Sequence, residues 1–175
     1  MANTIELEKT FLAKTVPPDL KDCRHKEILD MYIPKSSRHP TVRIRKNGDR
    51  FEMTKKEPVE DDASHQEEQT IILTEEEFNE LMKLDGKKVR KLRYHYPYNG
   101  RMAEVDVFQD DLLGIIVVDF EFDTVEDKDA FQLPDFCSAD ITHEEFIAGG
   151  MICGKTYEDV AADLERYKYV KLFLE

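Results

Sequence analysis

The sequence lacks an excess of basic residues: its 175 residues include 25 lysines and arginines against 38 aspartates and glutamates, a formal net charge of −13. A surface for duplex nucleic acid needs clustered surplus lysine and arginine, so we expect no such partner. The sequence also lacks any apolar run near the ~20 residues that cross a bilayer, and its first residues contain no apolar signal core. We therefore expect a cytoplasmic protein with no membrane partner.

Cysteine is also scarce, and Cys23, Cys137 and Cys153 form no closely spaced metal-binding pair. Three thiols cannot all pair with one another, and no neighbouring base in the sequence would activate one of them. We expect ordinary reduced thiols and no thiol nucleophile. With 41% hydrophobic residues the chain can bury a real core, and its length suits a single domain over residues 1–175.

Two Asn-Gly dipeptides are the strongest local signals in the sequence. Asn47-Gly48 and Asn99-Gly100 each lie between two β-like runs, and this dipeptide tolerates the positive φ angles of a tight hairpin turn. Residues 5–11 and 112–124 also have the composition of strands. The predicted order is therefore mostly antiparallel hairpins.

The remaining segments predict short helices or loops. Capping boxes predict helix starts after Thr74 and Thr142, each with a glutamate three residues later, and Thr156 opens a last helical stretch. The proline-marked segment 17–31 suggests a short helix or irregular cover. The acidic segment 57–66 predicts an exposed loop.

Charged residues of the predicted strands occur as pairs two positions apart, and each pair has a single sign. Residues two apart lie on the same face of a strand. The acidic pairs are Glu6 with Glu8, Glu104 with Asp106 and Asp119 with Glu121, and the basic pairs are Arg43 with Arg45 and Lys91 with Arg93. A plain antiparallel domain with a solvated charged face is one explanation, although such faces usually mix signs for cross-strand pairing. The alternative is a closed barrel with a charged interior.

The two kinds of pair suit one kind of ligand. Hard cations such as Mg²⁺ and Mn²⁺ take oxygen ligands and keep several waters, so a few carboxylates together with phosphate oxygens are enough. Arginine binds phosphate with two parallel hydrogen bonds, and lysine acts as a point charge. Together the pairs indicate a site for a metal ion and a polyphosphate chain.

In order and spacing, these pairs resemble the motifs of the CYTH superfamily, the triphosphate tunnel metalloenzymes. The matching residues, over positions 5–167, are Glu6 and Glu8, Arg43 and Arg45, Thr54 and Lys56, Lys91 and Arg93, Glu104 and Asp106, and Asp119 and Glu121. The chain departs from the pattern at Thr10, where the first family motif has a lysine. From the acidic motif that follows the 57–66 segment, only Glu67 is carried over.

The resemblance implies an α+β fold: an antiparallel eight-stranded β-barrel that forms a tunnel, with a charged interior and flanking helices. The residues that it implies for phosphate binding and charge neutralisation in catalysis are Arg43, Arg45, Lys56, Lys91 and Arg93. The implied cofactor is Mg²⁺ or Mn²⁺. Its implied ligands are Glu6, Glu8, Glu121 and Asp119, with Asp106 or Glu67 for a second ion.

The implied activity is metal-dependent hydrolysis of a triphosphate, most simply inorganic triphosphate as a small-molecule substrate. The short chain shows no appended domain to recognise a nucleoside, and it has no tryptophan to stack on a base or on thiamine. Three alternatives stay open: a class IV-type adenylate cyclase that forms cyclic AMP from ATP, a thiamine triphosphatase, and a non-catalytic polyphosphate or nucleotide binder. The sequence also leaves open whether two copies form a homodimer.

Overall fold

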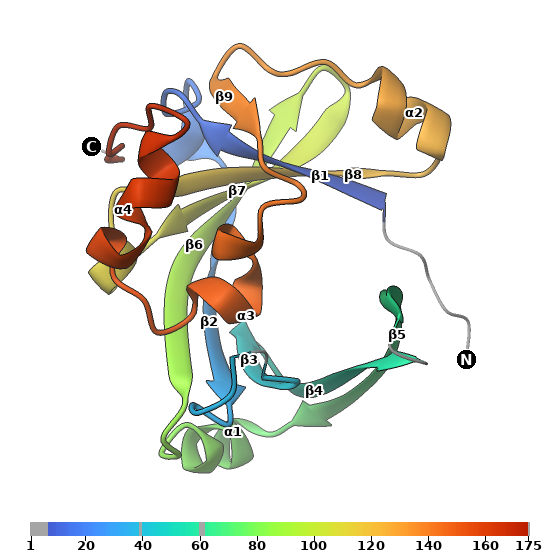
Figure 1. Ribbon diagram of the computed structural model, residues 1–175, viewed down its shortest axis with the longest axis vertical. Helices are drawn as coiled ribbons and strands as arrows, with labels where there is room; N and C mark the ends of the chain where they lie inside the picture. The colour runs from blue at the N-terminus through green and yellow to red at the C-terminus, as the bar shows by residue number, and fades with distance from the viewer. Residues whose placement is uncertain (1–6, 39, 60–61, 175) are drawn as a thin grey trace. The chain divides into compact units, whose positions relative to one another are not determined.

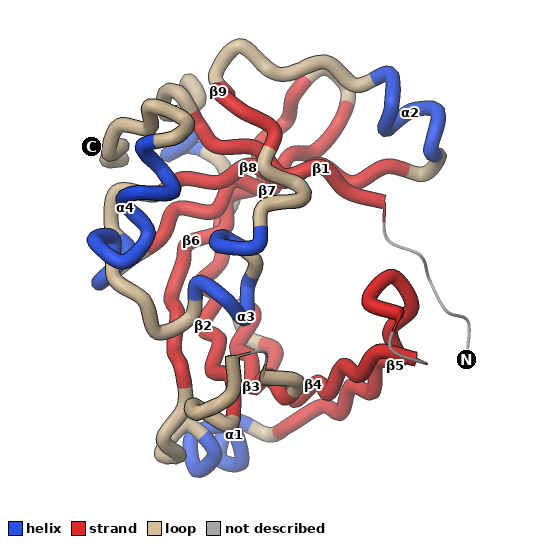
Figure 2. Tube along the Cα trace, in the orientation of Figure 1, coloured by secondary structure: helices blue, strands red, loops and turns tan. Residues whose placement is uncertain are grey.

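A computed structural model describes residues 7–38, 40–59 and 62–174, and for residues 56–59 and 62–68 it describes the backbone alone. The strands are β1 (Leu7–Ala13), β2 (His25–Ile33), β3 (Val42–Asn47), β4 (Arg50–Val59), β5 (Asp62–Leu73), β6 (Lys87–Tyr98), β7 (Arg101–Phe108), β8 (Ile116–Phe122) and β9 (Cys137–Asp140) (Figure 1). The helices are α1 (Glu75–Leu81), α2 (Val125–Ala130), α3 (Gly149–Ile152) and α4 (Tyr157–Glu165). Figure 2 shows that strands dominate and that the helices between them are short.

This composition confirms the predicted α+β class, in which antiparallel strands are accompanied by helices. Every pair of strands with a described register is antiparallel. The structure adds a ninth strand to the eight that were predicted, because the short β9 pairs with β1. None of the described helices has the length and hydropathy that a bilayer crossing requires.

The described chain divides into two compact units. Unit 1 comprises the described parts of residues 1–25, 92–146 and 156–175, and unit 2 comprises those of residues 26–91 and 147–155. Neighbouring strands follow the order β6-β7-β8-β1-β9 in unit 1 and β5-β4-β3-β2-β6 in unit 2. Strand β6 belongs to both orders because its first residues lie in unit 2 and its last residues in unit 1.

Both Asn-Gly hairpins are confirmed. Gly48 has a φ angle of +63° in the β3–β4 turn, and Asn99 and Gly100 have φ angles of 47° and 78° in the β6–β7 turn. Glycine and asparagine adopt these left-handed conformations more readily than other residues. The helices after Thr74 and Thr156 are confirmed as well, because each threonine accepts a hydrogen bond from the third residue of its helix.

The interpretation of residues 17–31 as a short helix or irregular cover holds for residues 17–24, which contain a 3-10 turn at Leu20–Asp22. It is wrong for residues 25–31, which belong to strand β2. The physical reason is the alternation of Leu29, Met31 and Ile33, whose apolar side chains occupy one face of an extended chain and pack in the core of unit 2.

Two further interpretations are wrong. The segment 57–66 is not a loop where the structure describes it, because β4 extends to Val59 and β5 begins at Asp62. Backbone hydrogen bonds between these long strands form whatever the polarity of their side chains, so tertiary pairing overrides the local signal. Thr142 caps no α-helix, since the next element is a 3-10 turn at Glu145–Ile147 and the N-cap of α3 is Ala148. Its hydroxyl donates to Asp140 instead.

The core of unit 1 lies on one face of its strands. Alternate residues of β1, β7 and β8, among them Phe11, Val105 and Phe120, are buried together. Phe131, which follows α2, packs its ring against those of Phe11 and Phe120 at centroid distances of 6.0 and 4.6 Å. Because successive side chains of a strand point to opposite faces, the other face of these strands carries the charged residues.

The core of unit 2 lies where α1 meets its strands. Met31, Ile44 and Phe78 are buried there, and the ring of Phe51 packs on that of Phe78 at a centroid distance of 5.0 Å. Gly86 comes so close to this core that a Cβ atom added to it would lie 2.4 Å from Cγ of Met31. The glycine therefore permits a close approach of the backbone to the packed methionine.

We expect Gly86→Ala to lower the free energy of unfolding by about 1–3 kcal/mol, because the added methyl group overlaps a side chain that the core holds in place. Chemical denaturation measures the change. Asp85→Ala is the matched control, since Asp85 is exposed and its ion pair with the exposed Lys35 contributes about 0–1 kcal/mol. Equal losses in the two variants would contradict the packing described above.

Thiol reactivity tests the burial of the cysteines. All three are free, as predicted; Cys137 and Cys153 are buried, whereas Cys23 is partly exposed. Burial raises the pKa of the Cys137 thiol to about 12, and it also raises that of Cys153. Because the thiolate is the reactive form, we expect Cys23 alone to react rapidly with Ellman's reagent in the folded protein. A fast reaction that persists in Cys23→Ser would contradict this.

Candidate functional site

Unit 2 presents a polar and charged sheet face opposite its core, and Arg43 and Arg45 lie on this face. In the described register each arginine belongs to a row of directly opposed residues. One row contains Asp30, Arg45 and Glu52, and the other contains Tyr32, Arg43, Thr54 and Thr70. Directly opposed residues have Cβ atoms about 4.5–5.5 Å apart. The members of each row therefore determine which charges surround its arginine.

Arg45 is held by a buried carboxylate. Its Nε and Nη2 atoms donate to the two oxygens of Asp30 at 2.6 and 2.7 Å, a bidentate arrangement that fixes the guanidinium plane. The Asp30 side chain is only 3% exposed, so removal of Arg45 would leave a buried carboxylate without this counter-charge. Glu52, on the other side of Arg45 in the row, forms an ion pair with Arg50 at 3.0 Å.

Arg43, by contrast, lies between hydroxyl groups. Its register neighbours are Tyr32 and Thr54, and the hydroxyl of Thr54 is hydrogen bonded to that of Thr70 at 2.9 Å. The Nε atom of Arg43 is buried and has no hydrogen-bond partner among the described residues. An acceptor oxygen from an anionic ligand would satisfy this donor, whose desolvation otherwise costs about 1–3 kcal/mol.

Tyr32 extends the row of Arg43 with a neutral hydroxyl. Burial raises the pKa of Tyr32, and the charge of Asp30 raises it further, so the phenol keeps its proton and can donate a hydrogen bond. Gly149 at the start of α3 lies against it, since a Cβ atom added there would be 2.9 Å from the Tyr32 Oη atom. The α3 segment therefore contributes to the burial of Tyr32.

Lys91 lies in the same electrostatic surroundings as Arg45. The thiol of Cys153 is influenced by both residues. Burial is the largest cause that raises its pKa, the charge of Asp30 raises the pKa further, and the charges of Lys91 and Arg45 lower it. These four residues of unit 2 are thus close enough to influence one another. The structure brings Lys91 together with the row of Arg45.

Two predicted residues on β4 and β5 can be placed by their backbone alone. The register aligns Lys56 with Glu68 and Glu57 with Glu67. Lys56 and Glu67 thus occupy different rows of the β4–β5 ladder. Their side chains lie outside the described part of the chain, so their predicted roles stay predictions.

Unit 1 carries acidic residues on the face opposite its core. The register aligns Glu8 of β1 with Glu121 of β8, and it aligns Asp119 of β8 with Thr10 of β1 and Glu104 of β7. Like charges that lie directly opposite each other destabilise a sheet. This face therefore favours cations between its strands.

Arg93 supplies one such cation from β6. Its Nε and Nη2 atoms donate to the two oxygens of Asp106 at 2.7 Å each, and Nη1 donates to Glu104. Its Nη2 atom also lies 3.5 Å from Oδ2 of Asp119. Burial lowers the pKa of Arg93, but the hydrogen bonds and charges of these carboxylates outweigh it and raise the pKa above the usual arginine range. The structure thus brings a permanently charged guanidinium together with three carboxylates.

Thr10 occupies the position at which the first family motif has a lysine. Its hydroxyl donates to Oδ1 of Asp119 at 2.7 Å, so a neutral donor contacts this carboxylate. The neighbouring Lys9 lies on the other face of β1, where its Nζ atom is 4.0 Å from Asp140. The charge of Lys9 is therefore not a substitute for the missing lysine.

The donor set of the acidic face fits a hard divalent cation, because it consists of oxygen atoms. Its described carboxylates are Glu8, Glu104, Asp106, Asp119 and Glu121. No three of the described histidine, cysteine, aspartate or glutamate side chains form a ready-made metal-binding group. Both Asp106 oxygens accept from Arg93, and Glu8 lies directly opposite Glu121 in the register of β1 and β8. Glu6, also predicted as a ligand, lies outside the described residues.

Asp30 and Tyr32 are candidate site residues that the sequence interpretation missed. The segment 17–31, predicted to form a helix or irregular cover, contains Asp30, and no strand is predicted for Tyr32, which follows it. The available signal was the alternation of Leu29, Met31 and Ile33, which puts the intervening Asp30 and Tyr32 on the opposite face of one strand. A strand assignment would have placed both residues beside the basic pair of β3.

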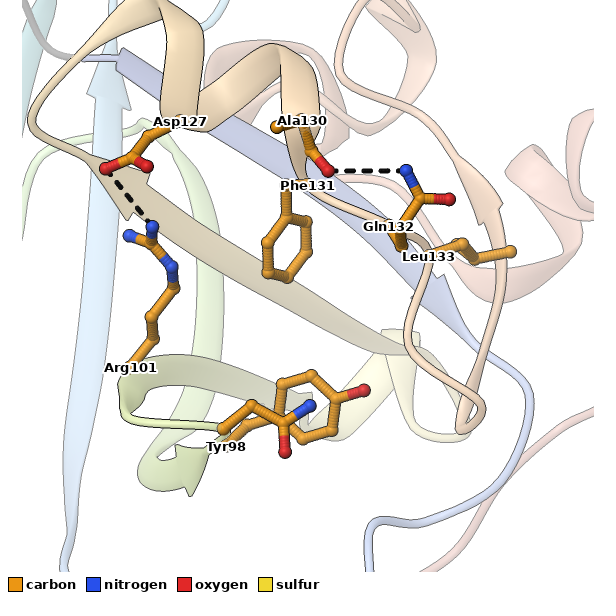
Figure 3. A pocket seen from close by; sticks show the side chains of 8 residues that line it. Tyr98, Arg101, Asp127, Ala130, Phe131, Gln132 and Leu133 are labelled. Atoms are coloured by element: carbon orange, nitrogen blue, oxygen red, sulfur yellow. Dashed lines mark hydrogen bonds and ion pairs between the residues drawn. The ribbon is translucent and has the colours of Figure 1, made fainter.

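A separate cleft of about 300 Å³ lies in unit 1 at the β6–β7 turn, lined by Tyr98, Arg101, Asp127 and Phe131 among others (Figure 3). Tyr98 and Arg93 have opposite parity on β6, so the cleft is on the apolar side of the strand. Arg101 forms an ion pair with Asp127 at 3.2 Å. Because this arginine already has a counter-charge, the cleft is less suited to phosphate than the face that carries Arg43.

Comparisons with known proteins identify the family and the fold. A model of the CYTH domain family matches residues 6–136. The structure resembles that of the inorganic triphosphatase NE1496, with a TM-score of 0.68 at 21% identity over 89% of this chain and 98% of that one. A second structure of NE1496 gives 0.68 at 23% identity, covering 86% and 99% of the two chains.

A protein from Bacillus halodurans, provisionally assigned as an adenylate cyclase, gives a TM-score of 0.54 at 14% identity and covers 100% of this chain and 96% of its own. At such identities the structural likenesses establish the fold. No curated protein matches the chain in a sequence comparison. The family match spans most of the chain and includes the basic pairs of β3 and β6 and the acidic pairs of β7 and β8. The chain belongs to the CYTH domain family.

Proposed function

We propose that this chain is a divalent-metal-dependent triphosphatase, with inorganic triphosphate as its simplest substrate and with residues 1–175 acting as one domain. The observation that carries the proposal is the buried Nε donor of Arg43, which has no partner among the described residues and lies in a row of neutral hydroxyl groups. A phosphate oxygen supplies the acceptor that this donor lacks. The family match over residues 6–136 supports the same function.

Phosphate binding is assigned to the basic residues of the charged faces. Arg43 offers the donor described above, Arg45 has its orientation fixed by Asp30, and Lys91 adds a positive charge close to Arg45. Tyr32 keeps its proton and can donate to the same anion. Lys56 and Arg93 are the other predicted phosphate-binding residues, and Arg93 lies in unit 1, where Asp106, Glu104 and Asp119 surround its guanidinium.

Metal binding is assigned to the acidic face of unit 1. Glu8, Glu121 and Asp119, together with Glu6, are the proposed ligands of Mg²⁺ or Mn²⁺, and Asp106 or Glu67 would serve a second ion. When bound, such a metal polarises phosphate oxygens and screens their charge. Glu8 and Glu121 are opposed across β1 and β8, so a cation shared by the two would relieve their repulsion.

The chain's own residues act on charge and position. Hydrolysis of a phosphoanhydride shifts negative charge toward the leaving phosphate, and Arg43, Arg45 and Lys91 would stabilise that charge as it develops. A water molecule is the proposed nucleophile. A thiol nucleophile is disfavoured, because burial raises the pKa of Cys153 and keeps it protonated.

We expect the protein to release phosphate from inorganic triphosphate in the presence of Mg²⁺ or Mn²⁺, and we expect a chelator to abolish the release. The measurement is a phosphate assay with inorganic triphosphate, ATP and thiamine triphosphate as separate substrates, alongside detection of cyclic AMP. Formation of cyclic AMP from ATP with little free phosphate would contradict the hydrolase proposal and indicate an adenylate cyclase. Tight binding of triphosphate without any product would contradict the hydrolase proposal and indicate a non-catalytic binding protein.

Substitution of Arg43 tests the residue that carries the proposal. We expect Arg43→Ala to lower kcat/KM by about 10²-fold or more, because it removes a donor directed at charge that develops in the transition state. Lys46→Ala is the matched control, since Lys46 lies on the same strand with the same charge but on the opposite face, paired with Glu27 at 3.0 Å. Equal activity of the two variants would contradict the assignment of Arg43 as a phosphate-binding residue.

A further inference from the structure

Thr10 is at the centre of a hydrogen-bond chain in unit 1. Its hydroxyl donates to Oδ1 of Asp119 at 2.7 Å. Its backbone N–H donates to Oγ1 of Thr142 at 3.1 Å, and its carbonyl accepts from the backbone N–H of Ile141 at 2.8 Å. Both backbone groups and the side chain of Thr10 are therefore engaged at once.

The chain continues from Thr142 to Asp140. Oδ1 of Asp140 accepts from the backbone N–H of Thr142 at 3.0 Å and from its hydroxyl at 2.5 Å. Since the hydroxyl proton of Thr142 is directed to Asp140, its oxygen is left to accept from the N–H of Thr10. The direction of each hydrogen bond between residues 140–142 and Thr10 is therefore determined. Linked hydrogen bonds of this kind strengthen one another.

The hydrogen bond from Thr10 helps to orient the carboxylate of Asp119. Thr10 contacts Oδ1, while Oδ2 lies 3.5 Å from Nη2 of Arg93. Contacts to two different oxygens determine the plane of the carboxylate. Loss of the Thr10 hydroxyl would remove the hydrogen bond to Oδ1 of Asp119 and leave the charge of Arg93 acting on Oδ2.

We propose that Thr10 is a positioning residue that orients Asp119 for divalent-cation binding, and that residues 140–142 hold Thr10 in place. This inference rests on the proposed function, because it takes Asp119 as a metal ligand. Mutation of a partner that orients a metal-ligating side chain typically costs about 10–100-fold in metal affinity. Residues 140–142 lie beyond the family match, which ends at residue 136, whereas Thr10 and Asp119 lie within it.

The test is a titration of the full chain with Mn²⁺ in the absence of substrate. Binding is measured by calorimetry and by the loss of the electron paramagnetic resonance signal of free Mn²⁺. Thr10→Val keeps the shape of the side chain and removes the hydroxyl, and we expect about 10-fold weaker Mn²⁺ binding. Thr10→Ser keeps a hydroxyl and should restore the affinity. Thr142→Val removes the acceptor for the Thr10 N–H and should weaken binding in the same direction.

Thr156→Val is the control for a loss of stability alone. It removes the capping box of α4, in which Thr156 is paired with Asp159, so it should lower the unfolding temperature without changing Mn²⁺ affinity. Thr10→Val with wild-type Mn²⁺ affinity would overturn the positioning role and leave the proposed function standing. If Thr156→Val lost as much Mn²⁺ affinity as Thr10→Val, the positioning role of Thr10 would also be overturned. A wild-type chain that binds no Mn²⁺ would overturn the metal-binding function itself.

Discussion

An arginine that is largely buried on a sheet face needs a counter-charge, and in this protein two buried aspartates supply it. Asp30 holds Arg45 in unit 2, and Asp106 holds Arg93 in unit 1, each through two hydrogen bonds of 2.6–2.7 Å. Removing one partner of such a pair leaves a buried charge, which costs about 3–5 kcal/mol. The charged faces of both units therefore depend on these pairs.

The pairs also leave a difference between the two arginines of β3. Arg45 is directed by Asp30, whereas Arg43 has hydroxyl groups on both sides and a buried Nε donor without a partner in the described structure. One arginine is thus oriented by the protein, and the other has a donor to offer a ligand.

Neutral hydroxyl groups act beside these charges. Tyr32 keeps its proton because it is buried next to Asp30, and Thr10 contacts Asp119 where the related motif has a lysine. The chain therefore has one positive charge fewer on β1, and the acidic face of unit 1 depends more on Arg93 and on added cations. The fold is that of the CYTH family, while this feature belongs to the individual chain.

The local pattern of the sequence was enough to predict the two Asn-Gly turns, the helices after Thr74 and Thr156, and the single-signed pairs two residues apart. These features depend on φ angles, capping and strand parity, which involve residues close together in the chain. The sequence could not show that Arg45 pairs with Asp30, that Arg93 binds three carboxylates, or that Thr10 contacts Asp119. Those contacts were decided by the tertiary structure, because strand register brings together residues separated by 11 to 109 positions, and no short-range signal specifies which of many carboxylates each arginine meets.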